Sequence, residues 1–261
     1  MNRLLSASIG LHGAALGAAI LAPGPRRGAA RRWALATVAA NQAVLTAAGM
    51  CPRSRLLGPN LARLPADLRG LVLSFDDGPD PDVTPRVLDL LDAAGAKASF
   101  FCLGQRARAF EDLVREIARR GHSVENHTEH HYRHFAALGR AAMRREIAGA
   151  QEVLTRLAGR PPRFFRAPMG LRNPLLQPVL DESGLRLASW TRRALDGARH
   201  CQPEAALRRL TRDLAPGDLL LMHDGNCARD AAGRPVVLDI LPPLLERMRA
   251  LDLPGLSLVS A

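Results

Sequence analysis

A cluster of histidines in the middle of the chain has the composition of a metal site. Five of the eight histidines lie within thirteen residues, at His122, His127, His130, His131 and His134. His127 and His131 are four positions apart, as are His130 and His134, so one helical turn would place either pair on one face. The spacing alone does not choose between the two pairs.

A carboxylate is the natural third ligand, and Asp76-Asp77-Gly78-Pro79-Asp80 supplies two adjacent candidates, Asp76 and Asp77. Neighbouring strand residues point in different directions, so one aspartate could bind a metal while the other accepts a proton from water. Two histidines and one carboxylate leave coordination positions open, which is typical of a catalytic metal. The alternative is that this segment is only a turn, since turns favour Asp, Gly and Pro.

Alternating strand and helix patterns account for the part of the chain that carries these residues. Short apolar runs predict buried strands at 71–75, 98–103, 123–126, 163–166, 185–190, 218–223 and 256–260. Amphipathic runs predict helices at 84–95, 106–120, 140–157, 174–183, 203–214 and 236–251. This alternation indicates a parallel sheet covered by helices, and about seven such units in roughly 190 residues suit a closed or nearly closed α/β barrel.

Polar residues lie at the carboxyl ends of five of these strands, where active sites gather in such folds. The first strand leads into Asp76 and Asp77, and the third leads into the histidine cluster. The others end at or lead into Arg166, Asp196 and His223. We therefore expect acids, imidazoles and a guanidinium to meet at one rim of the sheet.

The first 50 residues differ from the rest of the chain. Residues 4–22 and 33–50 carry no charge, and each stretch could cross a hydrocarbon core of about 30 Å. Both are rich in alanine and contain polar residues (His12, Asn41 and Gln42), so we expect a membrane-anchoring hairpin of two weak spans. A cleaved signal peptide and soluble or interfacial helices are the alternatives. Four arginines in the loop face four in the flanks, so the positive-inside rule gives no orientation.

Composition narrows the range of functions. With 47% hydrophobic and 23% charged residues, the 261-residue chain fits neither a disordered protein nor a polytopic membrane protein. The net charge of +11 is the excess of 36 basic over 25 acidic residues, and every basic residue except Lys97 is an arginine. Aromatic residues make up only 4%, too few for stacking single-stranded nucleic acid, so no nucleic-acid partner is expected. The four cysteines have no Cys-x-x-Cys spacing, which argues against a cysteine zinc site.

From about Leu71 to the C-terminus the chain resembles the polysaccharide deacetylases, also known as the NodB-homology domain or carbohydrate esterase family 4. Five motifs in the family's order carry the resemblance: Ser74-Phe75-Asp76-Asp77-Gly78, His127-Thr128-Glu129-His130-His131, Arg166-Ala167-Pro168, Asp196, and Leu221-Met222-His223. The resemblance implies a distorted (β/α)7 barrel at residues 70–261, following the hairpin (1–50) and a linker (51–69). It also implies a metal-dependent hydrolase, with zinc as the expected metal, that removes N-acetyl or other N-acyl groups from amino sugars of a glycan.

The resemblance assigns roles to the motif residues. It implies that Asp77, His127 and His131 bind the metal, which selects one histidine pair. Asp76 would be the general base that deprotonates water, and His223 the general acid that protonates the departing amine.

Supporting roles follow from the same resemblance. Arg166 would pair with Asp76, and Asp196 would support His223 as an imidazolium. The expected substrate contacts are Pro168, Met169, Gly170 and Leu221, with Leu221 lining the pocket for the acyl methyl group.

Two segments depart from the family's pattern. Met169 stands where an aromatic residue commonly follows the proline. The fourth motif, commonly Asp-x-x-Asp-Trp, reads Arg193-Ala194-Leu195-Asp196-Gly197 and so lacks one acid and the tryptophan. These changes put a long glycan bound along aromatic walls in doubt. Arg192 and Arg193 are candidates to meet an anionic group such as a lipid-linked phosphate, or they are simply arginines facing solvent.

Three functions therefore stand side by side. The first is an N-deacetylase of a glycan, located at a bacterial-type cell membrane with its side undetermined. The second is a deformylase or deacetylase of a polyprenyl-phosphate-linked sugar. The third, from another class, is a non-catalytic carbohydrate-binding barrel, which the retention of every expected ligand and of His223 disfavours.

Overall fold

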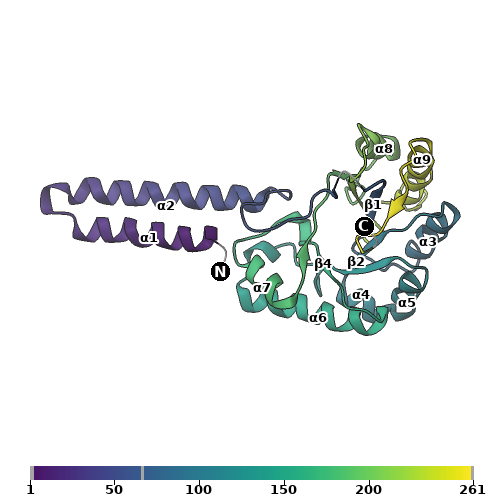
Figure 1. Cartoon of the computed structure of the whole chain (residues 1–261), viewed down its shortest axis with the longest axis horizontal. Coiled ribbons are helices and arrows are strands. Elements are labelled where there is room, and N and C mark those ends of the chain that lie inside the picture. Colours follow the sequence, from purple (N-terminus) through teal and green to yellow (C-terminus); the bar gives the residue numbers. More distant parts are fainter. Residues whose placement is uncertain (1–2, 66–67, 260–261) are drawn as a thin grey trace.

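The computed structural model describes residues 3–65 and 68–259, which form a projecting helical hairpin and an α/β body (Figure 1). The hairpin consists of α1 (Arg3–Leu21) and α2 (Arg27–Met50), joined by the 3-10 turn η1 (Gly24–Arg26). Three polar side chains meet between the helices, where the Asn41 side chain is 2.6 Å from Ser8 Oγ and 3.2 Å from His12 Nε2. Large apolar side chains lie outside, with Trp33 75% and Leu35 71% exposed.

The expectation that both N-terminal segments span a membrane is not supported. Among the residues described, no helix combines the length and the mean hydropathy that a bilayer crossing requires.

The hairpin meets the body at the C-terminal end of α2. The backbone N–H of Arg172 donates to the carbonyl oxygen of Gly49 at 3.2 Å. A Cβ atom on Gly49 would lie 2.1 Å from the carbonyl oxygen of Arg172, so only glycine allows this approach. The hairpin is thereby attached directly after the short 3-10 turn η3 (Pro168–Gly170).

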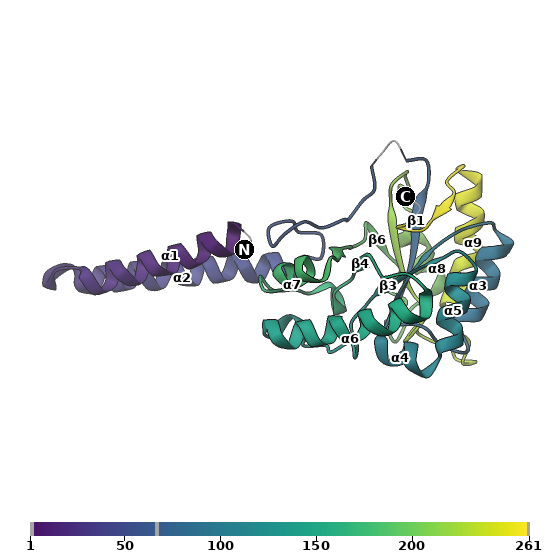
Figure 2. The same cartoon turned by 60° about the horizontal axis from the view of Figure 1, so that its bottom comes forward.

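The body is a curled parallel sheet with helices on its outer side (Figures 1 and 2). The strands occur in the order β5-β4-β3-β2-β1-β7-β6, and β8 pairs with the beginning of β1. The strands are β1 (Leu71–Asp76), β2 (Ser99–Cys102), β3 (Ser123–Asn126), β4 (Phe164–Phe165), β5 (Arg186–Leu187), β6 (Arg192–Arg193), β7 (Leu219–His223) and β8 (Gly255–Leu256).

One continuous segment touches both ends of this strand order. Residues 186–193 pair with β4 at their beginning, through β5, and with β7 at their end, through β6. The sheet therefore curls round on itself, as expected of a distorted barrel.

Helices follow the strands as the amphipathic patterns predict. They are α3 (Thr84–Ala93), α4 (Gly104–Ala109), α5 (Glu111–Arg119), α6 (Arg140–Ala158), α7 (Leu176–Ser183), α8 (Pro203–Thr211) and α9 (Val237–Ala250). Each turns an apolar face toward the sheet, and β1 lies at the centre of the core with all six residues buried. Phe75 of β1 stacks on Phe100 of β2 at a centroid distance of 5.1 Å.

Three expected elements differ from those observed. The single helix expected at 106–120 is interrupted at Phe110 (φ −134°, ψ 54°), because Glu111 and Asp112 begin a new helix, where acidic residues favour the N-terminus. The strand expected at 185–190 is limited to β5 (Arg186–Leu187), and β6 (Arg192–Arg193) lies beyond its expected end. The strand expected at 256–260 is limited to Gly255–Leu256, and Ser260 lies outside the described residues.

Candidate metal centre and active site

Asp77, His127 and His131 meet at the carboxyl ends of β1 and β3. The Nε2 atoms of His127 and His131 lie 3.4 Å and 3.5 Å from Oδ1 of Asp77, and one potential ligand atom from each residue lies within 4.8 Å of the others. Oδ1 of Asp77 is buried and has no hydrogen-bond partner among the described residues. A buried carboxylate oxygen without a partner is costly, so a cation between these three side chains fits the site.

The backbone brings the two histidines together without a helix. Thr128 and His131 both adopt left-handed conformations (φ 73° and 54°), whereas the sequence spacing suggested a helical turn. The N–H of His131 donates to Thr128 Oγ1 at 3.0 Å, and the N–H of Thr128 donates to Asn126 Oδ1 at 2.9 Å. His127 donates from Nδ1 to the carbonyl oxygen of Arg166 at 2.8 Å, which leaves its Nε2 lone pair for a metal.

The competing histidine pair lies elsewhere. His130 donates from Nδ1 to Glu146 Oε1 at 2.8 Å, and its backbone N–H donates to the other oxygen of Glu146 at 3.0 Å. Its ring stacks on Tyr132, which in turn stacks on His134. His130 and His134 therefore take part in an outer ring stack and are not in the cluster around Asp77.

Asp76 forms a buried ion pair with Arg166. Nη1 of Arg166 lies 2.5 Å from Oδ1 of Asp76, and Arg166 is 1% exposed. The guanidinium also donates to the carbonyl oxygen of Ser189 at 3.1 Å and lies 3.9 Å from the centre of the Phe101 ring. Oδ2 of Asp76 is 3.8 Å from His127 Nε2, so one oxygen is held by arginine and the other is directed toward the histidine cluster.

His223 at the end of β7 is supported by Asp196. Asp196 accepts hydrogen bonds from His223 Nδ1 and from the backbone N–H of the same residue, both at 2.8 Å. Burial lowers the pKa of His223, but the charge of Asp196 outweighs burial and raises this pKa to about 9. The imidazole is therefore protonated at neutral pH.

The electrostatics of the cluster favour competition between protons and a metal. Burial raises the pKa of Asp77, but the neighbouring imidazoles, His127 above all, bring it below its usual value. Burial lowers the pKa of His127, and the charges of Asp76 and Asp77 raise it above its usual value overall. The pKa of His131 is lowered by burial and by His127, which favours the neutral, metal-binding ring.

Two residues that follow His223 also support the site, and the sequence analysis gave them no role. Asp224 is buried behind the Asp76-Asp77-Gly78 turn, where burial raises its pKa to about 7 and the Thr84 hydroxyl donates to it at 2.6 Å. The Asn226 amide donates to Asp77 Oδ2 at 3.3 Å. Their only signal in the sequence is their closeness to His223 at a strand end.

The metal cluster, Asp76 and His223 open into one hollow of about 430 Å3. Met169, Gly170 and Leu221 line it as expected, whereas Pro168 is buried and does not. The lining also includes residues that the sequence analysis did not assign to the pocket, among them Arg133, Trp190, Leu195 and Asn226.

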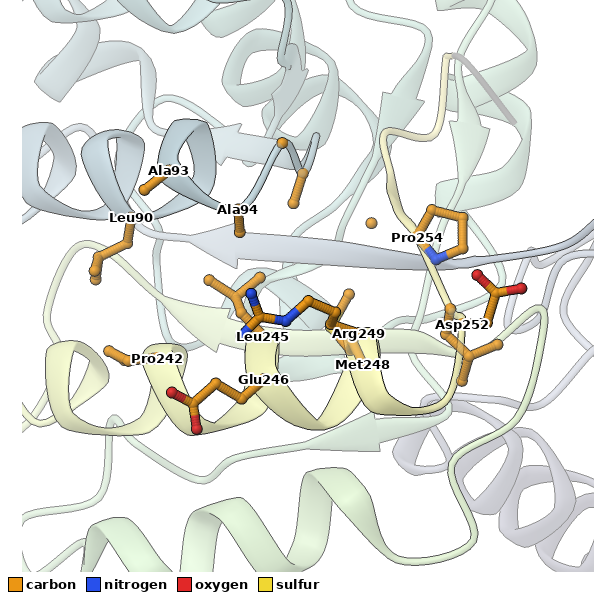
Figure 3. A pocket seen from close by; sticks show the side chains of 14 residues that line it. Leu90, Ala93, Ala94, Pro242, Leu245, Glu246, Met248, Arg249, Asp252 and Pro254 are labelled. Carbon is orange, nitrogen blue, oxygen red and sulfur yellow. The ribbon is translucent and has the colours of Figure 1, made fainter.

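A second hollow, of about 460 Å3, lies between α3, α9 and β8 (Figure 3). It borders Gly255, which pairs with the beginning of β1, and so lies at the opposite end of that strand from Asp76. Its lining contains apolar side chains with Glu246, Arg249 and Asp252, and no histidine. The chemistry of the chain is therefore concentrated in the 430 Å3 hollow.

Comparisons with known proteins point in the same direction as this geometry. The sequence pattern of the family described as polysaccharide deacetylase matches residues 65–188. A chitooligosaccharide deacetylase from Azorhizobium caulinodans is 33% identical over 172 residues, covering 66% of this chain and 80% of that protein. A peptidoglycan-N-acetylglucosamine deacetylase from Bacillus cereus is 34% identical over 155 residues, covering 59% of this chain and 55% of the relative, so the chain spans about half of that relative.

A solved structure shares the fold at lower identity. It is a pseudoenzyme of carbohydrate esterase family 4 from Bacillus anthracis, 18% identical, with a TM-score of 0.68 and coverage of 77% of this chain and 67% of the other. This likeness concerns the fold alone, so any inference about catalysis depends on the residues of the site.

The two histidine pairs give a matched test of the metal centre. We expect His131→Ala to weaken Zn²⁺ binding by more than the ~10–100-fold that the loss of a supporting residue costs a metal site, because it removes a ligand. His130→Ala, one position away, should retain the ion because His130 is bonded to Glu146. Equilibrium dialysis with metal analysis measures both affinities, and equal losses in the two variants would contradict the assignment.

Proposed function

The chain belongs to the polysaccharide deacetylase family, and from this we propose that it is a hydrolase that removes N-acetyl groups from amino sugars of a glycan. The observation that carries the proposal is the presence, in one hollow, of a three-ligand cluster, an arginine-held carboxylate and an aspartate-held imidazolium. The relatives are named for chitooligosaccharides and for the N-acetylglucosamine of peptidoglycan, which supports this class of substrate.

We propose that Asp77, His127 and His131 hold one divalent ion, with Zn²⁺ the metal that suits two imidazoles and a carboxylate. When bound, this ion would polarise the amide carbonyl and lower the pKa of a water molecule. The supporting contacts are those that metal sites use, since His127 is oriented by the Arg166 carbonyl and Asp77 by Asn226.

Asp76 is the proposed general base. An amide is a weak electrophile, so the attacking water must lose its proton as it forms a bond to carbon. The ion pair with Arg166 fixes one carboxylate oxygen and stabilises its negative charge, leaving Oδ2 to accept that proton. Because both residues are almost fully buried, the carboxylate has little freedom to turn away.

His223 is the proposed general acid. The amine is a poor leaving group until its nitrogen is protonated, and an imidazolium can donate that proton. The bond from Nδ1 to Asp196 leaves Nε2 as the donor toward the hollow. A pKa of about 9 keeps this proton on the ring through neutral pH.

The proposal is a catalytic one although a pseudoenzyme shares the fold. The residues that would bind the metal, deprotonate water and protonate the amine are all present here, and their contacts support one another. No observation favours a barrel that only binds carbohydrate.

We further propose that the hairpin binds the surface of an anionic lipid bilayer and so attaches the enzyme to the cell membrane. Its apolar side chains, such as Leu16 and Trp33, are more than 60% exposed, while its polar contacts are turned inward. The first 60 residues of the sequence contain no aspartate or glutamate. The turn between α1 and α2 lies at the end of the hairpin far from the body (Figure 1), and this turn and the start of α2 carry Arg26, Arg27, Arg31 and Arg32. Exposed apolar area beside uncompensated positive charge suits anionic headgroups.

The two aspartates separate metal binding from proton transfer. We expect Asp77→Ala to lose both the metal and turnover, and Asp76→Asn to keep the metal while kcat falls by ~10²–10⁴-fold, the contribution of one positioned base. Metal content and acetate release from N-acetylated chito-oligosaccharides measure the two effects. If both variants hydrolysed these sugars at the rate of the unmodified protein, the proposed function would be wrong.

The proposed general acid, His223, predicts where activity declines on the alkaline side of the pH profile. Because His223 must be protonated to act, kcat/KM should fall as the pH rises through about 9. Asp196→Asn removes the charge that opposes burial, so this limb should move to lower pH. Rate profiles of the two proteins test the shift, with the exposed Asp213→Asn as control. A limb that stays in place in Asp196→Asn would exclude His223 as the acid.

Lipid binding is tested with the full chain and vesicles of phosphatidylglycerol and phosphatidylcholine. The unmodified protein should sediment with the vesicles, and Leu16→Glu with Leu35→Glu should release it. Leu251→Glu, on the body, is the control. The proposal is wrong if the protein stays in solution, or if the same substitutions instead abolish a dimer that forms without lipid.

A further inference from the structure

Two guanidinium groups in the active-site hollow have no acidic partner. Arg133 and Arg193 both line the hollow together with Asp76, Asp77 and His223. Within the part of the chain that the structure describes, no hydrogen bond or ion pair involves either guanidinium group. A molecule that enters the hollow therefore meets two guanidinium groups that are not paired with a carboxylate of the protein.

The acids of the site are already engaged. Asp76 is paired with Arg166, Asp196 with His223, and Asp77 with the two histidines of the metal cluster. No acid of the hollow is therefore free to pair with Arg133 or Arg193, which are both exposed and open to an anionic group of a bound molecule.

Arg192 does not share this role, although the sequence analysis paired it with Arg193. Its side chain lies 3.1 Å from Asp218 and also donates to the carbonyl oxygen of Asp213. Asp218 is fully buried, so this ion pair ties β6 to the turn before β7. The sequence suggested that both arginines could meet the same anionic group. Because side chains alternate along a strand, Arg192 and Arg193 of β6 point to opposite sides.

The two unpaired arginines come from different segments, Arg193 from β6 and Arg133 from the loop after β3. The Arg193 guanidinium lies 5.9 Å from the centre of the Trp190 ring, within the range of a cation–π contact. Arg133 lies two residues after the ligand His131, in the loop where Tyr132 stacks between His130 and His134 at 5.3 Å on each side. Arg133 therefore shares a loop with His131 of the metal cluster, and Arg193 belongs to the segment whose Ser189 carbonyl accepts a hydrogen bond from Arg166.

Aromatic surface for stacking a sugar is scarce in the same hollow. Apart from the histidines, Trp190 is the aromatic residue of its lining, and Trp190 is only 7% exposed. Met169 and Gly197 also line the hollow and supply no ring. Recognition must therefore rely more on charge than on stacking.

We propose that the substrate is an N-acylated amino sugar that carries an oxyanion, a phosphate or a carboxylate, and that Arg133 and Arg193 bind this oxyanion. The inference rests on the proposed deacetylase function and names its substrate class. Guanidinium groups bind phosphate and carboxylate through paired, charge-assisted hydrogen bonds, which are stronger than neutral ones. The two arginines then select among N-acetyl sugars, while the metal cluster, Asp76 and His223 act on the amide.

The test compares three substrates that share one sugar. They are neutral N,N′-diacetylchitobiose, its 1-phosphate, and the corresponding aldonic acid, which carries a carboxylate. The metal-loaded full chain should give a higher kcat/KM for at least one anionic substrate than for the neutral one. The anion that is preferred identifies the source of the charge.

Variants assign that preference to the arginines. The ratio of anionic to neutral kcat/KM should fall by about tenfold for each of Arg133→Ala and Arg193→Ala, the worth of one hydrogen bond to a charged group. Arg247→Ala, which removes an exposed arginine on α9 outside the hollow, should leave the ratio unchanged. Binding of the same sugars to Asp76→Asn, measured by calorimetry, gives a second readout that does not depend on turnover.

The outcomes separate the two proposals. Equal kcat/KM for neutral and anionic sugars, or a preference that survives in the double arginine variant, overturns the anion inference and leaves the deacetylase function standing. If the metal-loaded protein hydrolyses none of these N-acetyl sugars or longer chito-oligosaccharides, the proposed function fails and the inference fails with it.

Discussion

Two adjacent buried carboxylates at the end of one strand are the constraint on which the rest of the site depends. Asp76 and Asp77 are each less than 10% exposed, and ionised groups so placed are expensive unless each has its own compensation. Arg166 supplies it for Asp76 as an ion pair. For Asp77 the compensation is incomplete, since one oxygen has only imidazoles beside it. The same arrangement therefore fixes the charge of Asp76, the proposed base, and leaves a place for a cation beside Asp77.

The curled sheet solves the problem of bringing these compensating groups together. β1 lies between β2 and β7, and its carboxyl end meets the residues that follow β3 and β4, so Arg166 and His127 reach it from 90 and 50 positions away. Glycines allow the close approaches that result. A Cβ on Gly225 would lie 2.1 Å from the carbonyl oxygen of Asp77, and one on Gly78 would lie 2.2 Å from Asp224.

Much of this arrangement could be predicted from the sequence because it depends on periodicity. Apolar runs such as Leu71-Val72-Leu73 mark strands, and the polar residues after them had to meet at one edge of a parallel sheet. The spacing of the histidines could not select the right pair. His131 has a left-handed backbone conformation and His130 is hydrogen-bonded to Glu146, and neither feature follows from spacing. Arg133 and Asn226 were missed for a similar reason, because a loop's path decides which side chains face the hollow.

Residues 186–193 contribute both to the proposed oxyanion site and to the support of Asp76. Their carbonyl at Ser189 holds the guanidinium that supports the base, and four positions later the same segment presents Arg193 beside Trp190. The Trp190 ring also lies 5.9 Å from the Arg166 guanidinium, so both arginines are within cation–π range of one indole. Protein engineers who alter this rim to accept another sugar will also disturb the clamp on Asp76. The loop of Arg133 has a different constraint, because it also carries His131 of the metal cluster.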